Sequence, residues 1–430
     1  MDDAWYSTSP PAFEHLLSMG ATPRPSVHTL PCVLMRAGTS KGLFIHKKDL
    51  PVQQKDWGPH LISALGSRGC DPRQIDGIGG GTSTTSKVAV VSPSTRPGID
   101  VDFTFVQVAI GKESVDFSGN CGNMVSGVGP FAVQEGLVRP AHGSSVCKVR
   151  VYNTNTKRVI IETVEIDQDG QFKEDGKYSI PGVNMSGSEV KVSFVDPAGS
   201  MTGKLFPTGN RQEVLEIHPR KHRGGFHVTV TLIDAANPFV LIDATSIASL
   251  LQTCSPDRQD DLVESIRVAG AVQMGLAADT QTASRTRGTP KAILLYPPIF
   301  RHEGADIRAR AYSMGRPHPS LQLTGAVGIA AALRSAGTVA ERLSRAPVLV
   351  DGLPLPLTPE RTPSPVEGSD EAAELSKGKN RSELLIEHDK GAIRVETEME
   401  RDENDQERVR SCAVSRTARR LFEGRVRYYV

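Results

Sequence analysis

The chain has 430 residues, of which 38% are hydrophobic, and it contains 40 Gly and 29 Pro. This length exceeds what one hydrophobic core usually serves, and the composition favours short strands and tight turns over a helical bundle. Fifty Lys and Arg residues against 49 Asp and Glu leave a net charge of +1, so neither nucleic acid nor an acidic membrane is expected as a partner, whereas a local cleft for a small anion is compatible with this balance.

The cysteines lie far apart in the sequence, with no CxxC pair and no Cys/His cluster at zinc spacing. We therefore expect a reducing compartment and no metal site. The N-terminal sequence Met-Asp-Asp-Ala-Trp has neither an apolar signal core nor an Arg-rich amphipathic start, and no segment is apolar over the length that a bilayer requires. These features predict a cytoplasmic protein without a membrane partner.

Residues 1–29 are proline-rich and predict a disordered arm. The apolar segments 31–36 and 42–46, joined by a short polar turn, then predict two paired strands. The turn carries the hydroxyls of Thr39 and Ser40 and the ammonium group of Lys41, which together suit a carboxylate or a phosphate. A solvated turn with a surface lysine is an equally good interpretation of this segment alone.

A helix is predicted over 57–65, and a glycine-rich segment then leads to Lys87 at the head of an apolar strand. The segment is neither a Walker loop nor a dinucleotide fingerprint, because no helix follows the glycines. Its glycines predict a close approach of the backbone to a ligand, beside the hydroxyls of Thr82 and Ser83. Partial desolvation would make Lys87 a usable base, while an exposed lysine that protects a strand end is the alternative.

Strands predicted at 101–109 and 114–117 lead to a polar loop and then to a small-residue apolar run that ends at Gly136. This pattern predicts that the loop delivers Cys121 to the first turn of a buried helix. Free backbone N–H groups there favour a thiolate and also suit a substrate carboxylate, which Asn120, Gly122 and Asn123 would orient. The alternative is that Cys121 is a small hydrophobic core residue.

Further strands are predicted at 147–152, 159–164 and 190–195, and the polar connection 196–210 marks a boundary. From residue 226 the order of elements recurs: strands at 226–233 and 237–242, a helix at 261–274, strands at 290–296 and 307–313, and a helix at 321–333. Lys87 precedes Cys121 by 34 positions, and Lys291 precedes Thr324 by 33. The sequence therefore predicts two copies of one unit, at residues 30–205 and 206–410.

Two such copies facing each other would form a cleft for a small polyanion between their central helices. Cys121 would then face Thr324 and Gly325 instead of a second thiol, which disfavours two-cysteine racemase chemistry. Lys291 is a further candidate for binding an anion. His318, in the sequence Arg-Pro-His-Pro, is a weaker candidate because a histidine in such a setting is more often a turn residue.

The last part of the chain is strongly charged. Residues 357–381 are also proline-rich and predict a disordered insertion, and 396–410 predict a surface loop. Residues 411–430 are expected to return to the first unit, with a short basic helix and a final strand.

Several segments resemble the PrpF family of isomerases, which are relatives of diaminopimelate epimerase. These segments are Met35-Arg-Ala-Gly-Thr-Ser-Lys-Gly42, Ile75-Asp-Gly-Ile-Gly-Gly-Gly81, Thr85-Ser-Lys-Val-Ala-Val-Val-Ser92, Asn120-Cys-Gly-Asn-Met124, Asp196-Pro-Ala-Gly-Ser200, Lys204-Leu-Phe-Pro-Thr-Gly209, Leu323-Thr-Gly-Ala-Val327 and Arg416-Thr-Ala-Arg-Arg420. The resemblance implies an α+β fold of two pseudo-repeated lobes, each a barrel-like sheet around a central helix, with the active site in the cleft between them.

The same resemblance implies that no cofactor or metal takes part, and that the partner is a small unsaturated di- or tricarboxylate such as aconitate, methylaconitate, methylitaconate or oxalomesaconate. Isomerisation would proceed by removal and return of a proton. Lys87 and Cys121 fall on the family's proposed acid/base pair, with their order open. The insertion at 357–381 and Gly328, where some relatives carry cysteine, depart from the family.

A non-catalytic protein that binds the same acids for an aconitase-like iron–sulfur enzyme is the alternative function. A homodimer is compatible with either function, because the sequence carries no signal for the oligomeric state.

Overall fold

The computed structural model describes residues 26–218, 224–298, 304–346, 349–350, 353–354, 380–401 and 407–430. Its strands are β1 (Val27–Ala37), β2 (Ser40–His46), β3 (Lys87–Pro93), β4 (Val101–Val108), β5 (Val115–Asp116), β6 (Val146–Asn153), β7 (Arg158–Glu165), β8 (Val190–Val195), β9 (Glu213–Ile217), β10 (Phe226–Asp234), β11 (Pro238–Asp243), β12 (Lys291–Tyr296), β13 (Ile307–Ser313), β14 (Arg316–Pro317), β15 (Leu349–Val350), β16 (Leu353–Pro354), β17 (Asn380–His388), β18 (Gly391–Arg401), β19 (Glu407–Arg416) and β20 (Ala418–Tyr429). Its α-helices are α1 (Trp57–Leu65), α2 (Gly122–Val125), α3 (Val128–Gln134), α4 (Ala248–Thr253), α5 (Pro256–Gln273), α6 (Thr280–Arg285), α7 (Leu323–Leu333) and α8 (Val339–Ser344).

The fold is mixed α/β, with few helices and a strand-rich sheet of 18 strands. One series of pairings runs β20–β1–β2–β3–β4–β6–β7–β8, in which β2–β3 and β4–β6 are parallel and the others antiparallel. A second series runs β9–β10–β11–β12–β13–β17–β18–β19, in which β11–β12 and β13–β17 are parallel and the others antiparallel. The same succession of pairings therefore occurs twice.

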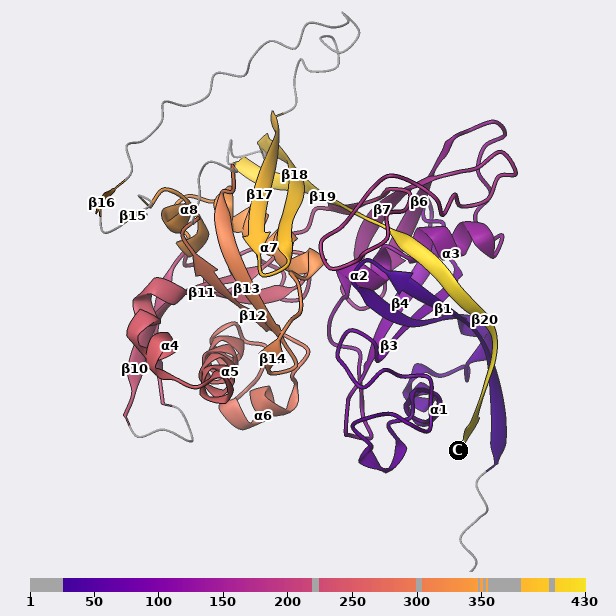
Figure 1. Ribbon diagram of the computed structural model, residues 1–430, viewed down its shortest axis with the longest axis horizontal. Coiled ribbons are helices and arrows are strands. Elements are labelled where there is room, and N and C mark those ends of the chain that lie inside the picture. Colours follow the sequence, from indigo (N-terminus) through magenta and orange to yellow (C-terminus); the bar gives the residue numbers. More distant parts are fainter. Residues whose placement is uncertain are drawn as a thin grey trace, which may run out of the picture.

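The two series meet where β8 pairs with β19, and β20 then runs beside β1 (Figure 1). β19 and β20 thus carry the end of the chain from the second series to the first. The boundaries of the two lobes, at 30–205 and 206–410, stay a prediction.

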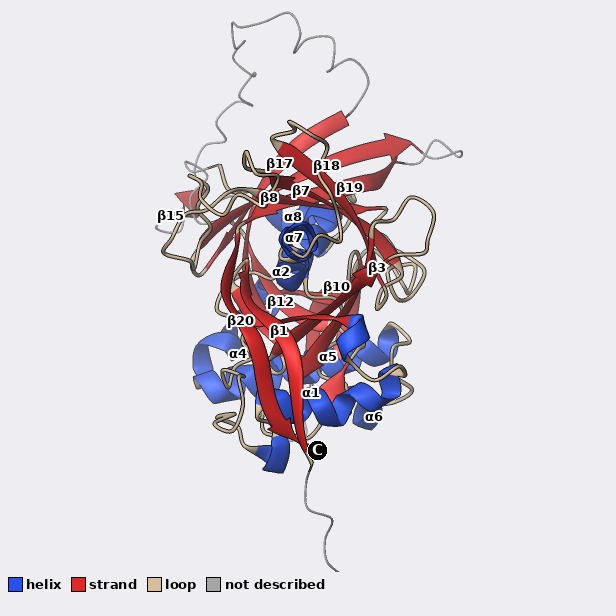
Figure 2. Cartoon of the chain, turned by 90° about the vertical axis from the view of Figure 1, so that its right-hand side faces the viewer, coloured by secondary structure: helices blue, strands red, loops and turns tan. Residues whose placement is uncertain are grey.

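The central helices lie among the strands of the two series. α2 and α3 pack against β1, β2, β3, β6 and β7, while α7 packs against β10, β11, β18 and β19. Figure 2 shows α2 and α7 surrounded by strands. Ten of the eleven residues of α7 are buried, which explains why its sequence is apolar on every side and rich in small residues.

The largest hydrophobic cluster joins both central helices, because it contains Met124 and Phe131 from α2 and α3 as well as Leu323 and Ala326 from α7. Two smaller clusters lie under α1 and under α5. The core between the two series therefore fixes the N-termini of α2 and α7 relative to each other. No helix in the described part of the chain is long and apolar enough to cross a bilayer.

The structure corrects three predictions about the ends of the chain. β1 already begins at Val27, so residues 27–29 belong to a strand instead of an arm, and residues 1–25 lie outside the described residues. Residues 396–401 and 407–410 lie in β18 and β19 instead of a surface loop. The predicted basic helix near the C-terminus is β20, which pairs with β1 from Ala418 to Tyr429. The predicted insertion at 357–381 lies outside the described residues except for 380–381, which open β17.

Candidate active site

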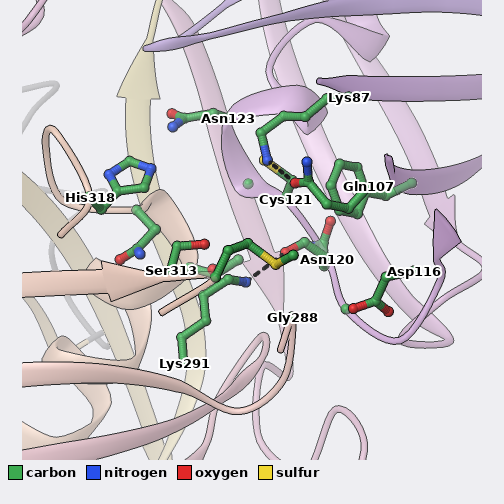
Figure 3. Close-up of a pocket in the computed structure, with 16 residues that line it drawn as sticks. Lys87, Gln107, Asp116, Asn120, Cys121, Asn123, Gly288, Lys291, Ser313 and His318 are labelled. Atoms are coloured by element: carbon green, nitrogen blue, oxygen red, sulfur yellow. Dashed lines mark hydrogen bonds between the residues drawn. The ribbon is translucent and has the colours of Figure 1, made fainter. Parts of the chain in front are cut away.

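A pocket lies where the loop before α2 meets the segments before β12 and α7 (Figure 3). The residues that line it come from both strand series: Lys87, Phe105, Gln107, Asp116, Gly119, Asn120, Cys121, Gly122, Asn123, Gly288, Lys291, Ser313, Met314, His318, Gln322 and Thr324. Eight of the candidates from the sequence are in this set. They are Lys87, Asn120, Cys121, Gly122, Asn123, Lys291, His318 and Thr324.

Lys87 is the first residue of β3, and its side chain is buried. Its Nζ donates a hydrogen bond to Gln107 Oε1 at 2.8 Å and lies 5.0 Å from the centre of the Phe105 ring. Gln107 is held in turn, because its Nε2 donates to the Ser86 carbonyl at 2.8 Å. The amide therefore holds the amine in the pocket without neutralising it with a negative charge.

Cys121 is half-buried and caps the N-terminus of α2, in an extended conformation with φ −117° and ψ 98°. The predicted delivery of this residue to a helix start is confirmed. The predicted continuous helix to Gly136 is wrong in detail, because α2 ends at Val125 and α3 begins at Val128. At the junction, Gly127 packs so tightly on the Phe44 ring that a Cβ would lie 2.6 Å from its Cζ atom.

The N-termini of α2 and α7 touch each other. A Cβ built on Gly122 would lie 2.8 Å from Leu323 Cβ and 3.1 Å from Thr324 N. Thr324 thus lines the same pocket as Cys121. Its Oγ1 atom is buried and has no hydrogen-bond partner among the described residues.

Asn120 and Asn123, on either side of Cys121, differ in whether their side-chain amides are hydrogen-bonded within the protein. Asn123 is engaged by the protein, because its Nδ2 donates to Thr39 Oγ1 at 3.0 Å and its Oδ1 accepts from Arg416 Nε at 3.3 Å. Asn120 Oδ1 accepts from Asn153 at 3.0 Å, but its buried Nδ2 has no partner in the described part of the chain. An unpaired buried donor costs free energy, so Asn120 is the better placed of the two to bind a ligand oxygen.

Lys291 enters the pocket from β12 and approaches the Asn120 carbonyl oxygen at 3.5 Å (Figure 3). Lys291 is half-buried, and this burial lowers the pKa of Lys291 to about 8, with Cys121 and Asp116 opposing the shift and the charge of Lys87 adding to it. Both protonation states of Lys291 are therefore accessible near neutral pH.

His318 is buried at the pocket wall. Its Nδ1 lies 2.6 Å from the Ser320 carbonyl oxygen and 3.2 Å from the Ser320 backbone N. Burial lowers the pKa of His318 to about 3, so the ring is neutral at physiological pH. It is more than the turn residue that the local sequence indicates, because it forms part of the wall.

The hairpin turn and the glycine-rich loop do not reach the pocket. Thr39 contacts the pocket only indirectly, because its Oγ1 accepts from Asn123 Nδ2 and lies 3.1 Å from Ser320 Oγ. Neither Ser40, which is buried, nor Lys41 lines the pocket.

In the glycine-rich loop, Thr82 is exposed and bonds with neighbouring threonines, and Ser83 is half-buried outside the pocket lining. The glycines pack on the protein itself. Gly81 N donates to Gln74 Oε1 at 2.9 Å, and a Cβ on Gly79 would collide with the same side chain. These glycines are therefore needed for folding around Gln74 and not for approach to this pocket.

Two glycines of α7 also face the core. A Cβ on Gly325 would lie 3.0 Å from Ile293 Cδ1, and one on Gly328 would lie 3.4 Å from the Phe239 ring. Neither lines the pocket. The absence of a cysteine at position 328 therefore removes no group from the pocket wall.

Gln107 and Asp116 line the pocket, but the sequence analysis did not select them. Gln107 lies opposite Lys87 in the β3–β4 register, and a lone amide near the end of the apolar strand Val101–Val108 is the only local signal. Asp116 packs against Gly288, where a side chain would collide with its carboxylate. Within the described ranges, no group of three or more His, Cys, Asp or Glu side chains is arranged to hold a metal ion.

The family model described as PrpF protein matches residues 27–348. The chain belongs to the PrpF family. It is 36% identical over 328 residues to the 2-methyl-aconitate isomerase of Shewanella oneidensis, with 71% of this chain and 81% of that protein covered. It is 34% identical over 396 residues to the 4-oxalomesaconate tautomerase of Pseudomonas putida, with 92% and 95% covered.

A crystal structure of methylitaconate-delta-isomerase matches with a TM-score of 0.65 and 32% sequence identity, and the match covers 94% of this chain and 96% of that one. The named curated relatives and this structural neighbour are isomerases or tautomerases, and the PrpF protein described here is an isomerase.

Proposed function

We propose that this PrpF protein is a cofactor-independent isomerase of unsaturated tricarboxylic acids of the aconitate or 2-methylaconitate type, or of closely related dicarboxylic acids. It would act by moving a double bond or by letting it rotate. The observation that carries the proposal is that Lys87 and Cys121 line the same pocket as the cation of Lys291 and the unpaired amide donor of Asn120. The names of the relatives fit substrates of this class.

The reaction begins with removal of a proton from the carbon next to a C=C bond that is conjugated to a carboxylate. The electron pair spreads over the carbon chain and onto the carboxylate as a dienolate. Donors that meet the oxygens where this charge develops lower the barrier, and Asn120 Nδ2, Thr324 Oγ1 and, when it is protonated, the amine of Lys291 are the candidates. Return of a proton at another carbon completes the shift.

Lys87 and Cys121 are proposed as the acid/base pair. Gln107 orients the amine of Lys87 through a neutral hydrogen bond, so that amine can gain or lose a proton without breaking an ion pair. Cys121 lies at the start of α2 and lines the same pocket as the Lys87 amine. Either residue can be the base with the other as the donor.

The two series of strand pairings support a two-lobed arrangement, with this pocket between the lobes. Each series would contribute one lysine and one helix N-terminus to the same anion. This organisation would let a single substrate contact residues that lie about two hundred positions apart in the chain, such as Lys87 and Lys291, which line one pocket.

The function is tested by incubating the purified protein in D₂O with cis-aconitate, trans-aconitate, 2-methylaconitate, 2-methylitaconate and 4-oxalomesaconate, and by following each acid by NMR. We expect one or more acids to isomerise and to take up deuterium at the allylic carbons. Neither a new isomer nor deuterium uptake with any acid would oppose the proposal. Binding of an acid without either change would favour the non-catalytic accessory protein, which the isomerase relatives already disfavour.

A further inference from the structure

Lys291 occupies the same place in the second strand series as Lys87 does in the first. Lys87 opens β3, which lies between a parallel neighbour, β2, and an antiparallel neighbour, β4. Lys291 opens β12, which lies between the parallel β11 and the antiparallel β13. Both amines point into one pocket (Figure 3), so the pocket receives one amine from each series.

The surroundings of Lys291 favour proton exchange over a fixed ion pair. Its closest polar contact in the described part of the chain is the neutral Asn120 carbonyl oxygen at 3.5 Å, and its Nζ lies 5.9 Å from the centre of the Phe239 ring. The titratable groups that line the pocket with it are Lys87, Cys121 and Asp116, together with His318, which is neutral.

On the outer side of Lys291, the charged groups are already paired. Arg267 bonds to Glu264 of the same helix at 2.8 Å, and Arg287 lies 3.8 Å from that carboxylate. A buried lysine with a purely structural role would be expected to form an ion pair with a carboxylate of the protein. Lys291 has no such carboxylate within ion-pair distance among the described residues, so its amine is available to a ligand.

We propose that Lys291 is a third acid–base residue, which exchanges a proton with one end of the substrate's allylic unit while either Lys87 or Cys121 serves the other end. This inference rests on the proposed isomerase function. In one direction the neutral amine of Lys291 takes the allylic proton: the C–H bond breaks, an N–H bond forms, and the electron pair enters the dienolate.

The Lys87 ammonium group or the Cys121 thiol then gives its proton to the carbon at the other end of the allylic unit. A C–H bond forms there, and the C=C bond has moved by one position. Exchange of protons with water restores both groups. The reverse reaction uses the same groups in exchanged roles. A half-buried amine with a pKa of about 8 suits both roles, because proton transfer is most efficient when the pKa lies near the working pH.

The test is Lys291→Arg, measured with the acid that the wild-type protein isomerises. Arginine keeps the positive charge but cannot act as a base at neutral pH. We expect kcat to fall by about 10²–10⁴-fold, with KM changed much less. The limb of the wild-type pH–kcat profile near pH 8 should disappear. Retention of kcat within threefold, with that limb unchanged, would show that Lys291 only binds the anion and would overturn the inference.

Deuterium exchange into unreacted substrate distinguishes the two directions. If Lys291 removes the proton, Lys291→Arg abolishes exchange together with turnover; if it returns the proton, exchange continues while turnover is lost. Should the arginine variant not fold, as judged by circular dichroism, Lys291→Ala with added ethylamine replaces it, and failure of amines to restore turnover would overturn the inference. Absence of turnover in the wild-type protein would instead refute the function itself.

Discussion

Gly122→Ala tests whether the close contact between the N-termini of α2 and α7 organises the site. The added Cβ would lie 2.8 Å from Leu323 Cβ, 2.9 Å from Leu323 Cδ2 and 3.1 Å from Thr324 N. Carbon atoms normally pack about 3.5–4.0 Å apart, so the two helix starts must separate by roughly 0.7–1.2 Å. Side-chain rotation cannot relieve the contact, because Leu323 Cβ and Thr324 N are fixed by the backbone.

We expect overpacking to lower the free energy of unfolding by about 1–3 kcal/mol, and displacement of Cys121 from Thr324 to lower kcat/KM by about 10²-fold. Thermal melting and steady-state kinetics with the acid that the wild type isomerises measure the two effects. Gly58→Ala in α1 is the matched control, because its Cβ would meet only Val115 Cγ2 at 3.6 Å and alanine is the better helix former. Wild-type stability and kinetics in Gly122→Ala would refute the reasoning.

The other predictions concern the acid/base pair, its support and one buried carboxyl group. Lys87→Met and Cys121→Ala should each lower kcat by about 10²–10⁴-fold in steady-state assays, and near-full activity in both variants would remove the proposed pair. Gln107→Leu should lower kcat by about 10–10²-fold, more than it raises KM, because one hydrogen bond to a charged group is worth about 1.5–3 kcal/mol. It should also change the pH dependence of kcat, and an unchanged profile would argue against a positioning role. Burial raises the pKa of Glu162 well above its usual value, so this carboxyl group reduces stability increasingly as pH rises above its unfolded pKa of about 4.3. The melting temperature of Glu162→Gln, relative to that of the wild type, should therefore rise from pH 4 to pH 8. A difference in melting temperature that does not depend on pH would contradict this.

Local patterns were sufficient to predict the elements that build the site. The apolar run after Lys87 predicts β3, and its residues Val88–Val91 are buried because strands and helices cover both faces. The segment 57–65 predicts α1 with the observed bounds. In both cases the signal lies within about ten neighbouring residues.

The C-terminal strand could not be predicted in this way. The sequence Arg-Arg-Leu-Phe-Glu-Gly-Arg-Val-Arg does not alternate regularly between apolar and polar residues. In the structure, β20 pairs with β1, and the apolar residues Leu421 and Phe422 are exposed. Its partner lies some four hundred residues earlier in the chain, where Val27 is paired with Tyr429. Pairing across such a distance decides the conformation, and helix propensity does not.

In the candidate site, too, local sequence predicts some residues, whereas others depend on contacts between distant segments. Motifs identified Lys87, Cys121 and Lys291, and the structure brings all three to one pocket. Gln107 and Asp116 depend on strand register and on the fit of Gly288 against a carboxylate, which no local motif records. Conversely, the hydroxyl-rich sequence around Thr82 looks like an anion-binding loop but is used to enclose Gln74.

A crystal structure of the protein with bound trans-aconitate would show whether Lys87 and Cys121 meet the substrate. We expect the acid to lie between the starts of α2 and α7, with a carboxylate oxygen on Asn120 Nδ2 and a carbon of the allylic unit about 3–3.5 Å from Lys87 Nζ or Cys121 Sγ. An acid bound elsewhere, or bound with both groups turned away from its carbon chain, would contradict this expectation.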